Sequence, residues 1–193
     1  MKRRVIVRGF VAIFTVGAAL CSSCGKRAWQ REIEAFIGQT IVFPDTLQPV
    51  LDGRAVDNLN LLANRTASLV VWIDSLGCTS CALQHLDPWY EVIDYASRMS
   101  ERFRVIFLLS PKRQDRHRID RSTILFKYPM YIDRECRFEA LNPAVPKADR
   151  LHVFLLDSAN RVVLVGSPIG NRKLWELYKQ QIGKLTGQNG AAE

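Results

Sequence analysis

A continuous apolar run near the middle of the chain anchors the hydrophobic pattern. The stretch Ala67–Asp74 is short and rich in β-branched residues, which is typical of a strand covered on both faces. Beyond it, apolar residues recur at helical spacing: Ala82, Leu83, Leu86, Trp89, Tyr90 and Ile93. The pattern predicts a buried strand followed by a helix. Asp87-Pro88 should kink this helix, because proline lacks a backbone donor, and Asp87 should cap its second half.

The same patterns predict the other elements. Strands are expected at Ile41–Phe43, Arg104–Leu109 and Tyr128–Ile132. Hairpins are expected at Val50–Val56 and at Leu151–Asp157 with Arg161–Gly166. Helices are expected at Ala28–Ile37, Lys112–Lys127 and Asn171–Leu185. In the last helix, Leu174, Leu177, Tyr178, Ile182 and Leu185 should face inward. Strand–helix–strand units that end in a hairpin and a helix predict an α/β fold, with a mixed central sheet covered by helices on both faces.

The N-terminus has the pattern of an export signal. Basic residues at Lys2, Arg3, Arg4 and Arg8 precede an apolar run, Gly9–Leu20, that is too short for a stable transmembrane helix. The following Leu20–Gly25 resembles the lipobox of bacterial lipoproteins. This resemblance implies cleavage before Cys24 and its lipidation, since Ser22 and Ser23 are small. Lipidation at Cys21 and simple secretion are the alternatives.

Composition narrows the possible functions. A chain of 193 residues with 48% apolar content can bury one core. The net charge of +8 is concentrated at the start: four of the 27 basic residues and none of the 19 acidic residues lie in the first 23 positions. The remainder carries only about +4, which argues against a nucleic-acid-binding protein.

Two cysteines lie where the buried strand gives way to the helix. Cys78 would stand at a helix N-terminus, where free N–H groups and the macrodipole favour a thiolate and lower the thiol pKa. Cys81, one turn later, could attack a mixed disulfide. A zinc half-site and an inert disulfide are the alternatives, but no second Cys-x-x-Cys or His-x₃₋₅-His accompanies the pair. The fifth cysteine, Cys136, is either a partly buried free thiol or a third redox partner.

Three polar residues could line this site. Asp74 ends the buried strand four residues before Cys78 and could relay a proton to the resolving cysteine, or cap the strand end. His85 lies near the helical face of the cysteines and is either a surface residue or a proton donor or ligand. His152 begins the strand that should face the cysteines.

Several segments together resemble a known group. Leu51-Asp52-Gly53-Arg54, the apolar strand with its Cys-x-x-Cys, and Phe154–Asp157 with Arg161-Val162-Val163 resemble the thioredoxin-fold reductases of the TlpA and alkyl-hydroperoxide-reductase-like group. The resemblance implies a thioredoxin-like three-layer fold, Cys78 as nucleophile, Cys81 as resolving cysteine, and no cofactor beyond this dithiol. Protein or small-molecule disulfides would be the substrates.

The sequence departs from that group in three places. Gly77 replaces the tryptophan before the first cysteine, Thr79-Ser80 replaces Gly-Pro, and Leu151 stands where the group has a substrate-docking cis-proline. The lost proline keeps two alternatives open: a copper-binding protein that uses Cys78, Cys81 and a histidine, because soft thiolates suit Cu(I), or a redox-silent module that docks a partner.

The resulting interpretation is a membrane-anchored, periplasm-facing thiol-disulfide oxidoreductase, most simply a reductase. Residues 1–23 would be the signal peptide, 24–36 a tether and short helix, 37–185 the thioredoxin-like domain and 186–193 a disordered tail. Its partners would be disulfide substrates and, through the lipid on Cys24, a bacterial membrane, with no nucleic acid and no bound metal.

Overall fold

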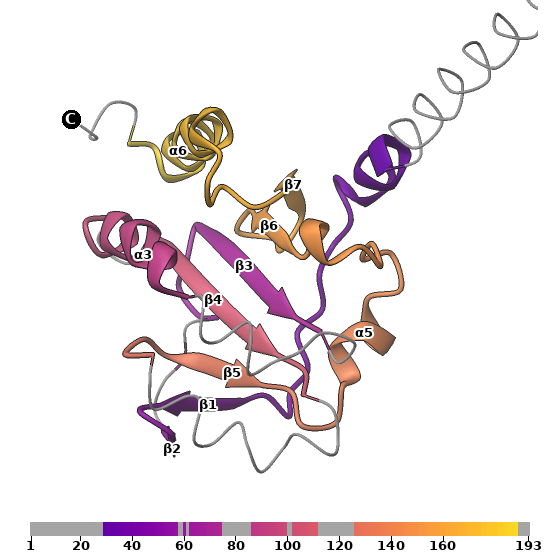
Figure 1. Ribbon diagram of the computed structural model, residues 1–193, viewed down its shortest axis with the longest axis vertical. Helices are drawn as coiled ribbons and strands as arrows, with labels where there is room; N and C mark the ends of the chain where they lie inside the picture. Colours follow the sequence, from indigo (N-terminus) through magenta and orange to yellow (C-terminus); the bar gives the residue numbers. More distant parts are fainter. Residues whose placement is uncertain are drawn as a thin grey trace, which may run out of the picture. The chain divides into compact units, whose positions relative to one another are not determined.

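The computed structural model describes residues 29–57, 60, 62–74, 86–99, 102–111 and 126–188 (Figure 1). The chain divides into two compact units, Met1–Ala35 and Phe36–Glu193. Residues 29–36 are helical, as the periodicity predicted. None of the helices among the described residues combines the length and hydrophobicity that crossing a membrane requires.

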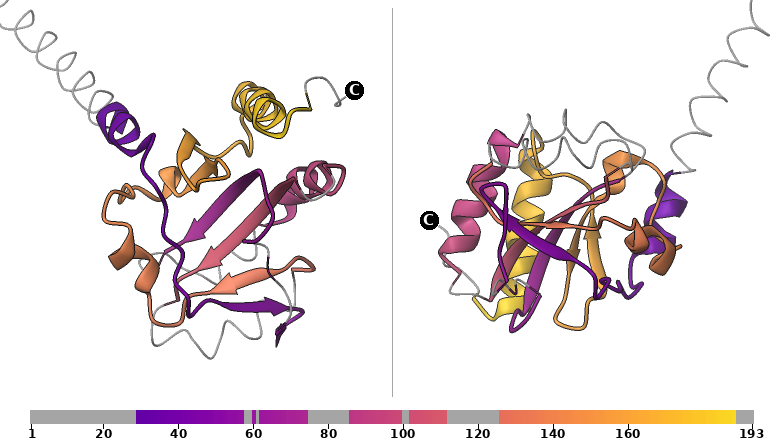
Figure 2. Two further views of the ribbon diagram at one scale, coloured as in Figure 1. Left: turned by 180° about the vertical axis from the view of Figure 1, so that it is seen from behind. Right: turned by 90° about the horizontal axis from the view of Figure 1, so that it is seen from below.

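A mixed sheet forms the centre of the second unit. Its seven strands within the described residues are β1 (Gln48–Leu51), β2 (Arg54–Ala55), β3 (Ala67–Ile73), β4 (Phe103–Leu109), β5 (Met130–Ile132), β6 (Val153–Leu156) and β7 (Val162–Val165). They lie in the order β2-β1-β5-β4-β3-β6-β7. The strands β3, β4 and β5 are parallel, whereas β6 runs antiparallel to β3, and β1 antiparallel to β5. Figure 2 shows β3, β4, β5 and β1 side by side.

Both predicted hairpins are present. In the β1–β2 turn, Asp52 and Gly53 have φ angles of 51° and 73°, the two positive values that a tight type I′ turn needs. In the β6–β7 turn, the Asp157 carboxylate accepts hydrogen bonds from the backbone N–H groups of Ala159 and Arg161 and from the Arg161 guanidinium. Burial raises the pKa of Asp157, but these bonds outweigh it and hold this pKa below its usual range.

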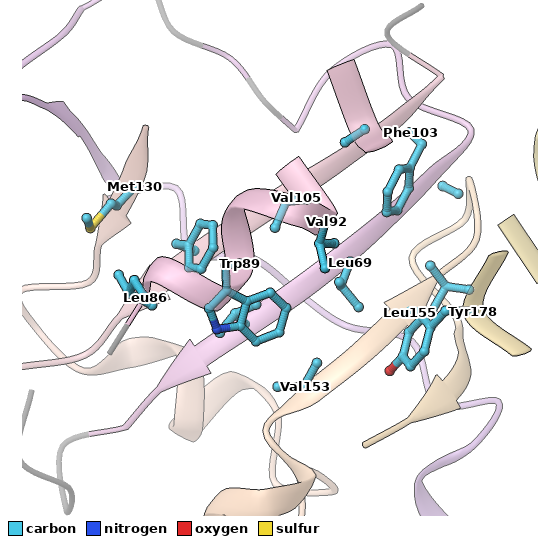
Figure 3. Close-up of a cluster of buried hydrophobic side chains, with 14 of the residues drawn as sticks. Leu69, Leu86, Trp89, Val92, Phe103, Val105, Met130, Val153, Leu155 and Tyr178 are labelled. Carbon is cyan, nitrogen blue, oxygen red and sulfur yellow. The ribbon is translucent and has the colours of Figure 1, made fainter. Parts of the chain in front are cut away.

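One face of the sheet carries the main hydrophobic core. Alternate residues of the central strands, including Leu69, Val105 and Leu155, point to this face. The residues packed on them come from η1 (Asp87–Trp89), α3 (Tyr90–Ser97) and α6 (Arg172–Thr186), and include Trp89, Val92, Trp175, Tyr178 and Ile182. Figure 3 shows Leu86, Trp89 and Val92 beside β3. Burying this apolar surface is the main source of stability.

The opposite face is covered by a shorter helix and by the chain that leads into β1. Phe36 packs edge-on against Phe154 of β6, with ring centroids 5.2 Å apart. Trp72 of β3 packs at the same centroid distance on Phe138 of α5 (Arg137–Leu141). The Asn142 side chain holds this layer together, because it accepts a hydrogen bond from Val42 N and donates to Val42 O and Phe138 O, each 2.8 Å long.

Several expected elements differ from those observed. Residues 41–43 form no strand; instead Thr40 makes one isolated bridge to Arg161, because the neighbouring N–H and C=O groups bond to the β7 edge and to Asn142. Asp87 lies within η1 and does not cap α3, whose N-cap residue is Trp89. Neither α5 nor η4 (Asp149–Leu151) was predicted, because both are too short to show a periodic pattern.

The buried face of the last helix also differs from the predicted one. Asn171 caps it as expected, with its side chain accepting from Leu174 N, and the helix ends one residue beyond Leu185. However, Leu177 is 38% exposed, so its predicted inward position was wrong. The buried stripe contains Trp175, Tyr178 and Ile182, three and four residues apart, and Leu177 falls about 100° away from Tyr178 around the helix.

Candidate functional site

The carboxyl ends of the parallel strands bring one set of polar residues to a single edge of the sheet. The arrowheads of β3, β4 and β5 point to the same side in Figure 1, towards α5. Asp74, Ser110 and Asp133 directly follow these three strands, and all three are buried. Because β6 is antiparallel to β3, His152 at the start of β6 reaches the same edge. The segment with Cys78, Cys81 and His85 follows Asp74 and lies outside the described residues, as does Cys24.

His152 is buried and held from several sides. Its side chain is only 3% exposed, and its ring lies 4.3 Å, centroid to centroid, from the ring of Trp72. Its Nε2 atom is 2.8 Å from the carbonyl oxygen of Pro146, and its Nδ1 atom is 4.0 Å from Oδ2 of Asp74. Both ring nitrogens therefore face oxygen atoms of the protein.

The structure brings together two of the residues that the sequence suggested separately. Asp74 and His152 are far apart in the chain, yet their side chains meet at the end of β3, where both are more than nine-tenths buried. The register explains the meeting: Val71 pairs with Val153 and Trp72 N donates to His152 O, so His152 lies opposite Trp72. Asp74, two residues beyond Trp72, is then a diagonal neighbour of His152. A buried carboxylate beside an imidazole can hold or pass a proton.

Leu151 lies in a tight helical turn and not in an extended docking strand. It is the last residue of η4 and is 3% exposed. Its N–H donates to Ala148 O, and the N–H of His152 donates to Asp149 O. None of the described residues is joined by a cis peptide bond. The backbone N–H groups at this position are thus bonded within the protein, and Leu151 contributes packing.

A second chain of contacts along this edge was not predicted. The indole Nε1 of Trp72 donates to Ser110 Oγ (3.0 Å), which in turn donates to Asp133 Oδ2 (3.3 Å). The Asp133 carboxylate also accepts from the backbone N–H groups of Arg137 and Phe138 at the start of α5. The sequence did carry one indication that these residues reach this edge: Ser110 and Asp133 each directly follow a buried strand, as Asp74 does.

Cys136 lies on the same edge, between β5 and α5. It is partly buried and makes no disulfide within the described part of the chain, and its Sγ is 3.5 Å from Pro111 O beyond β4. Its backbone has a φ angle of +54°, which a residue with a side chain rarely adopts. The Cys136 thiol is therefore partly buried beside the end of β4.

Comparison with known proteins identifies the fold. No family model matches the sequence, and no curated protein matches it. Among solved structures, the chain resembles a Chlorobium tepidum protein described as a thiol:disulfide interchange protein, DsbE, with a TM-score of 0.50, 14% identity, and 76% of this chain and 98% of that chain covered. It also resembles AhpC of Enterococcus faecalis, with a TM-score of 0.50, 13% identity, and 81% and 99% covered.

The sheet topology gives the structural class of the protein, and the similarity to solved structures gives its fold. The chain is an α/β protein built on a mixed sheet. Its architecture is the thioredoxin-like fold, as the sequence resemblance implied. At such low identities the similarity establishes the fold alone.

Proposed function

We propose that this protein is a thiol-disulfide oxidoreductase, acting as a reductase, with Cys78 as the nucleophile and Cys81 as the resolving cysteine. The observation that carries the proposal is the position of Asp74: the strand that precedes the Cys-x-x-Cys ends at a buried polar edge of a thioredoxin-like sheet, beside His152. A dithiol at that edge would exchange with the disulfide of a protein or of a small molecule.

The expected reaction has two steps. The Cys78 thiolate attacks a substrate disulfide and forms a mixed disulfide, releasing the first substrate thiol. Cys81 then attacks the Cys78 sulfur, which releases the second substrate thiol and leaves Cys78 and Cys81 joined. Two electrons pass from the dithiol to the substrate, and two protons end on the released thiols.

A trapping experiment tests this assignment. If Cys81 resolves the mixed disulfide, the Cys81→Ser protein should accumulate disulfide-linked substrates in cells, visible as slower bands on non-reducing gels. Cys78→Ser is the matched control and should accumulate none, because it lacks the attacking thiol. The absence of trapped species from both variants would argue against an oxidoreductase.

Copper binding is the alternative function, and the contacts of His152 disfavour it. A histidine that joins two thiolates on Cu(I) must offer a ring nitrogen with a free lone pair. The Nε2 atom of His152 is 2.8 Å from Pro146 O, and its Nδ1 atom faces Asp74. Within the described ranges, no group of three or more histidine, cysteine, aspartate or glutamate residues is placed to hold a metal.

The location forms part of the same proposal. We infer export and a lipid on Cys24, because the start of the chain combines a basic segment, an apolar run and a lipobox-like Ser-Ser-Cys. The domain would then act at the periplasmic face of a membrane, where disulfides form and need reduction. The multiple acyl chains of a lipidated cysteine would make the anchor stable.

A further inference from the structure

A hollow of about 270 Å³ lies at the start of β4, beside α3. Its lining includes Ile93 and Ala96 of α3, Phe103 and Arg104 of β4, and Tyr128 and Pro129, which precede β5. Ala96 and Phe103 are buried, whereas the other four are partly exposed, so the hollow has an apolar floor and opens to solvent. Figure 1 shows α3 alongside β4.

The short ladder between β4 and β5 explains why this space exists. The two parallel strands pair only from Phe107 with Met130 onward, so no described residue continues the ladder along the first half of β4. Pro129 cannot extend it, because proline has no backbone N–H. The Tyr128 hydroxyl instead donates to Val105 O (3.2 Å), and its ring centroid lies 5.7 Å from that of Phe107. Side chains rather than a further strand therefore border β4 here.

Arg104 supplies the charge of this hollow. Among the described residues that line it, Arg104 is the only charged one. Burial raises the pKa of Tyr128, while the hydrogen bond to Val105 O and the positive charge of Arg104 offset part of this rise. The guanidinium therefore acts on the hydroxyl at the wall of the hollow. A guanidinium has five N–H donors, so Arg104 can bind an anion and keep its contacts within the protein.

A second guanidinium reinforces the positive field. Arg104 pairs in register with Ser68, and the Ser68 hydroxyl accepts a 3.0 Å hydrogen bond from Arg65 Nε. Within the described part of the chain, the hydrogen-bond partners of Arg65 are neutral, because the other two are carbonyl oxygens of Leu62 and of the Asn160 side chain. The start of β4 therefore favours a ligand that carries a negative charge.

We propose that this hollow binds a small monocarboxylate with an apolar body, of the size of one aromatic ring with a short acid side chain. Arg104 holds the carboxylate through paired N–H···O hydrogen bonds, and Ile93, Ala96 and Phe103 contact the apolar body. The volume lies just below the range of about 300–1,000 Å³ that drug-sized ligands occupy, which limits the ligand to about one ring.

The site is separate from the polar edge that precedes the cysteines. Phe103 begins β4 and Leu109 ends it, and six residues of strand span about 20 Å. Ser110 and Asp133 lie beyond the far end of β4 and β5. Binding at Arg104 is thus a property additional to the proposed oxidoreductase function and can be tested without it.

A chemical-shift titration of the ¹⁵N-labelled full chain with 3-phenylpropionate tests the site. The matched probe is 3-phenylpropanamide, which has the same ring and chain but no charge. We expect saturable shifts at the backbone amides of Ala96, Phe103 and Tyr128, with a dissociation constant below about 1 mM. The neutral amide should bind at least tenfold more weakly, because it cannot form the charge-assisted pair of hydrogen bonds with Arg104.

Arg104→Gln should weaken the binding of 3-phenylpropionate at least tenfold and leave that of the amide within about twofold. Arg104→Lys keeps the charge but loses the planar fork, so a loss of about threefold is expected. Arg102→Gln is the matched control, because it makes the same change two residues earlier, where the guanidinium donates to Thr186 O. Its affinity for both probes should equal that of the parent protein.

Ser97→Phe tests the hollow itself from an exposed position of α3. The added ring should occupy the opening and weaken both probes at least fivefold, which keeps the test decisive if Arg104→Gln fails to fold. Thermal melts of each variant verify folding. Equal affinity for acid and amide would overturn the proposal and favour an apolar group of a protein partner as the occupant. Shifts centred elsewhere, or none at about 10 mM probe, would also overturn it.

Discussion

The indole Nε1 of Trp72 donates a 3.0 Å hydrogen bond to Oγ of Ser110, and this bond joins the carboxyl ends of β3 and β4. Both side chains are buried, and Ser110 donates in turn to Asp133, which follows β5 and accepts from the first N–H groups of α5. The bond fixes the end of the strand that leads to the cysteines. Polar contacts thus supplement apolar packing at this edge.

Trp72→Phe tests the strength of this connection. Phenylalanine keeps part of the contact with Phe138 but removes the N–H donor, so we expect the free energy of unfolding to fall by about 1–3 kcal/mol. Urea denaturation measures the change. Ser110→Ala and the double variant complete a mutant cycle, in which a coupling energy of about 1 kcal/mol is expected. If the losses of unfolding free energy in the two single variants add up to the loss in the double variant, the hydrogen bond contributes nothing to stability and the prediction is wrong.

Half-buried and fully buried tyrosines predict a loss of stability in alkali. Burial raises the pKa of Tyr95, Tyr128 and Tyr178 above the ordinary value near 10. Above pH 10 the unfolded chain releases these protons while the folded chain retains them, so stability is complete below about pH 10 and falls as the pH rises. The fully buried Tyr178 contributes a slope of up to about 1.4 kcal/mol per pH unit, whereas the partly exposed Tyr95 and Tyr128 contribute less because solvent screens them.

Tyr178→Phe isolates the largest of these effects. Tyr178 is fully buried, and its hydroxyl donates a 2.7 Å hydrogen bond to Gly166 O. Removing the hydroxyl should cost about 1–3 kcal/mol near neutral pH, because the carbonyl loses its partner. Above pH 10, the stability of the variant should decline less steeply than that of the parent. Equal slopes in urea denaturation between pH 8 and 11 would contradict this assignment.

Cys136 offers a test of backbone strain. Its φ angle of +54° suits glycine and disfavours residues that branch at Cβ. Cys136→Gly should therefore unfold at a free energy close to that of the parent, whereas Cys136→Val should be about 1–2 kcal/mol less stable than Cys136→Gly. Urea denaturation of both variants under reducing conditions measures the difference. A valine variant as stable as the glycine variant would be the contrary result.

The lipid anchor can be tested independently of the redox chemistry. Cys24→Ala should release the domain from the membrane fraction and abolish the mass of the acyl chains, because the modified sulfur is absent. Cys21→Ala is the matched control and should leave both unchanged. Fractionation and mass spectrometry of the mature N-terminus provide the readouts. An unmodified N-terminus downstream of Cys24 in the parent protein would refute the assignment.

Local patterns in the sequence determined much of the fold. The apolar run at Ala67–Ile73 forms β3, because a strand covered on both faces needs no polar alternation. Asp52-Gly53 forms the first turn and Asn171 caps α6, because each depends on the backbone preferences of residues adjacent in sequence. The position of Asp74 at the end of β3 could also be predicted from the sequence, because Asp74 is the polar residue that ends the apolar run.

Only the tertiary structure decided which polar groups meet. The pairing of Asp74 with His152 depends on the register of β3 and β6, and the contact between Ser110 and Asp133 depends on the order of parallel strands. The exposure of Leu177 was likewise set by the packing of α6 on the sheet, which selected the stripe with Trp175 and Tyr178. Such contacts join residues far apart in the chain, so a periodic pattern within one segment carries no information about them.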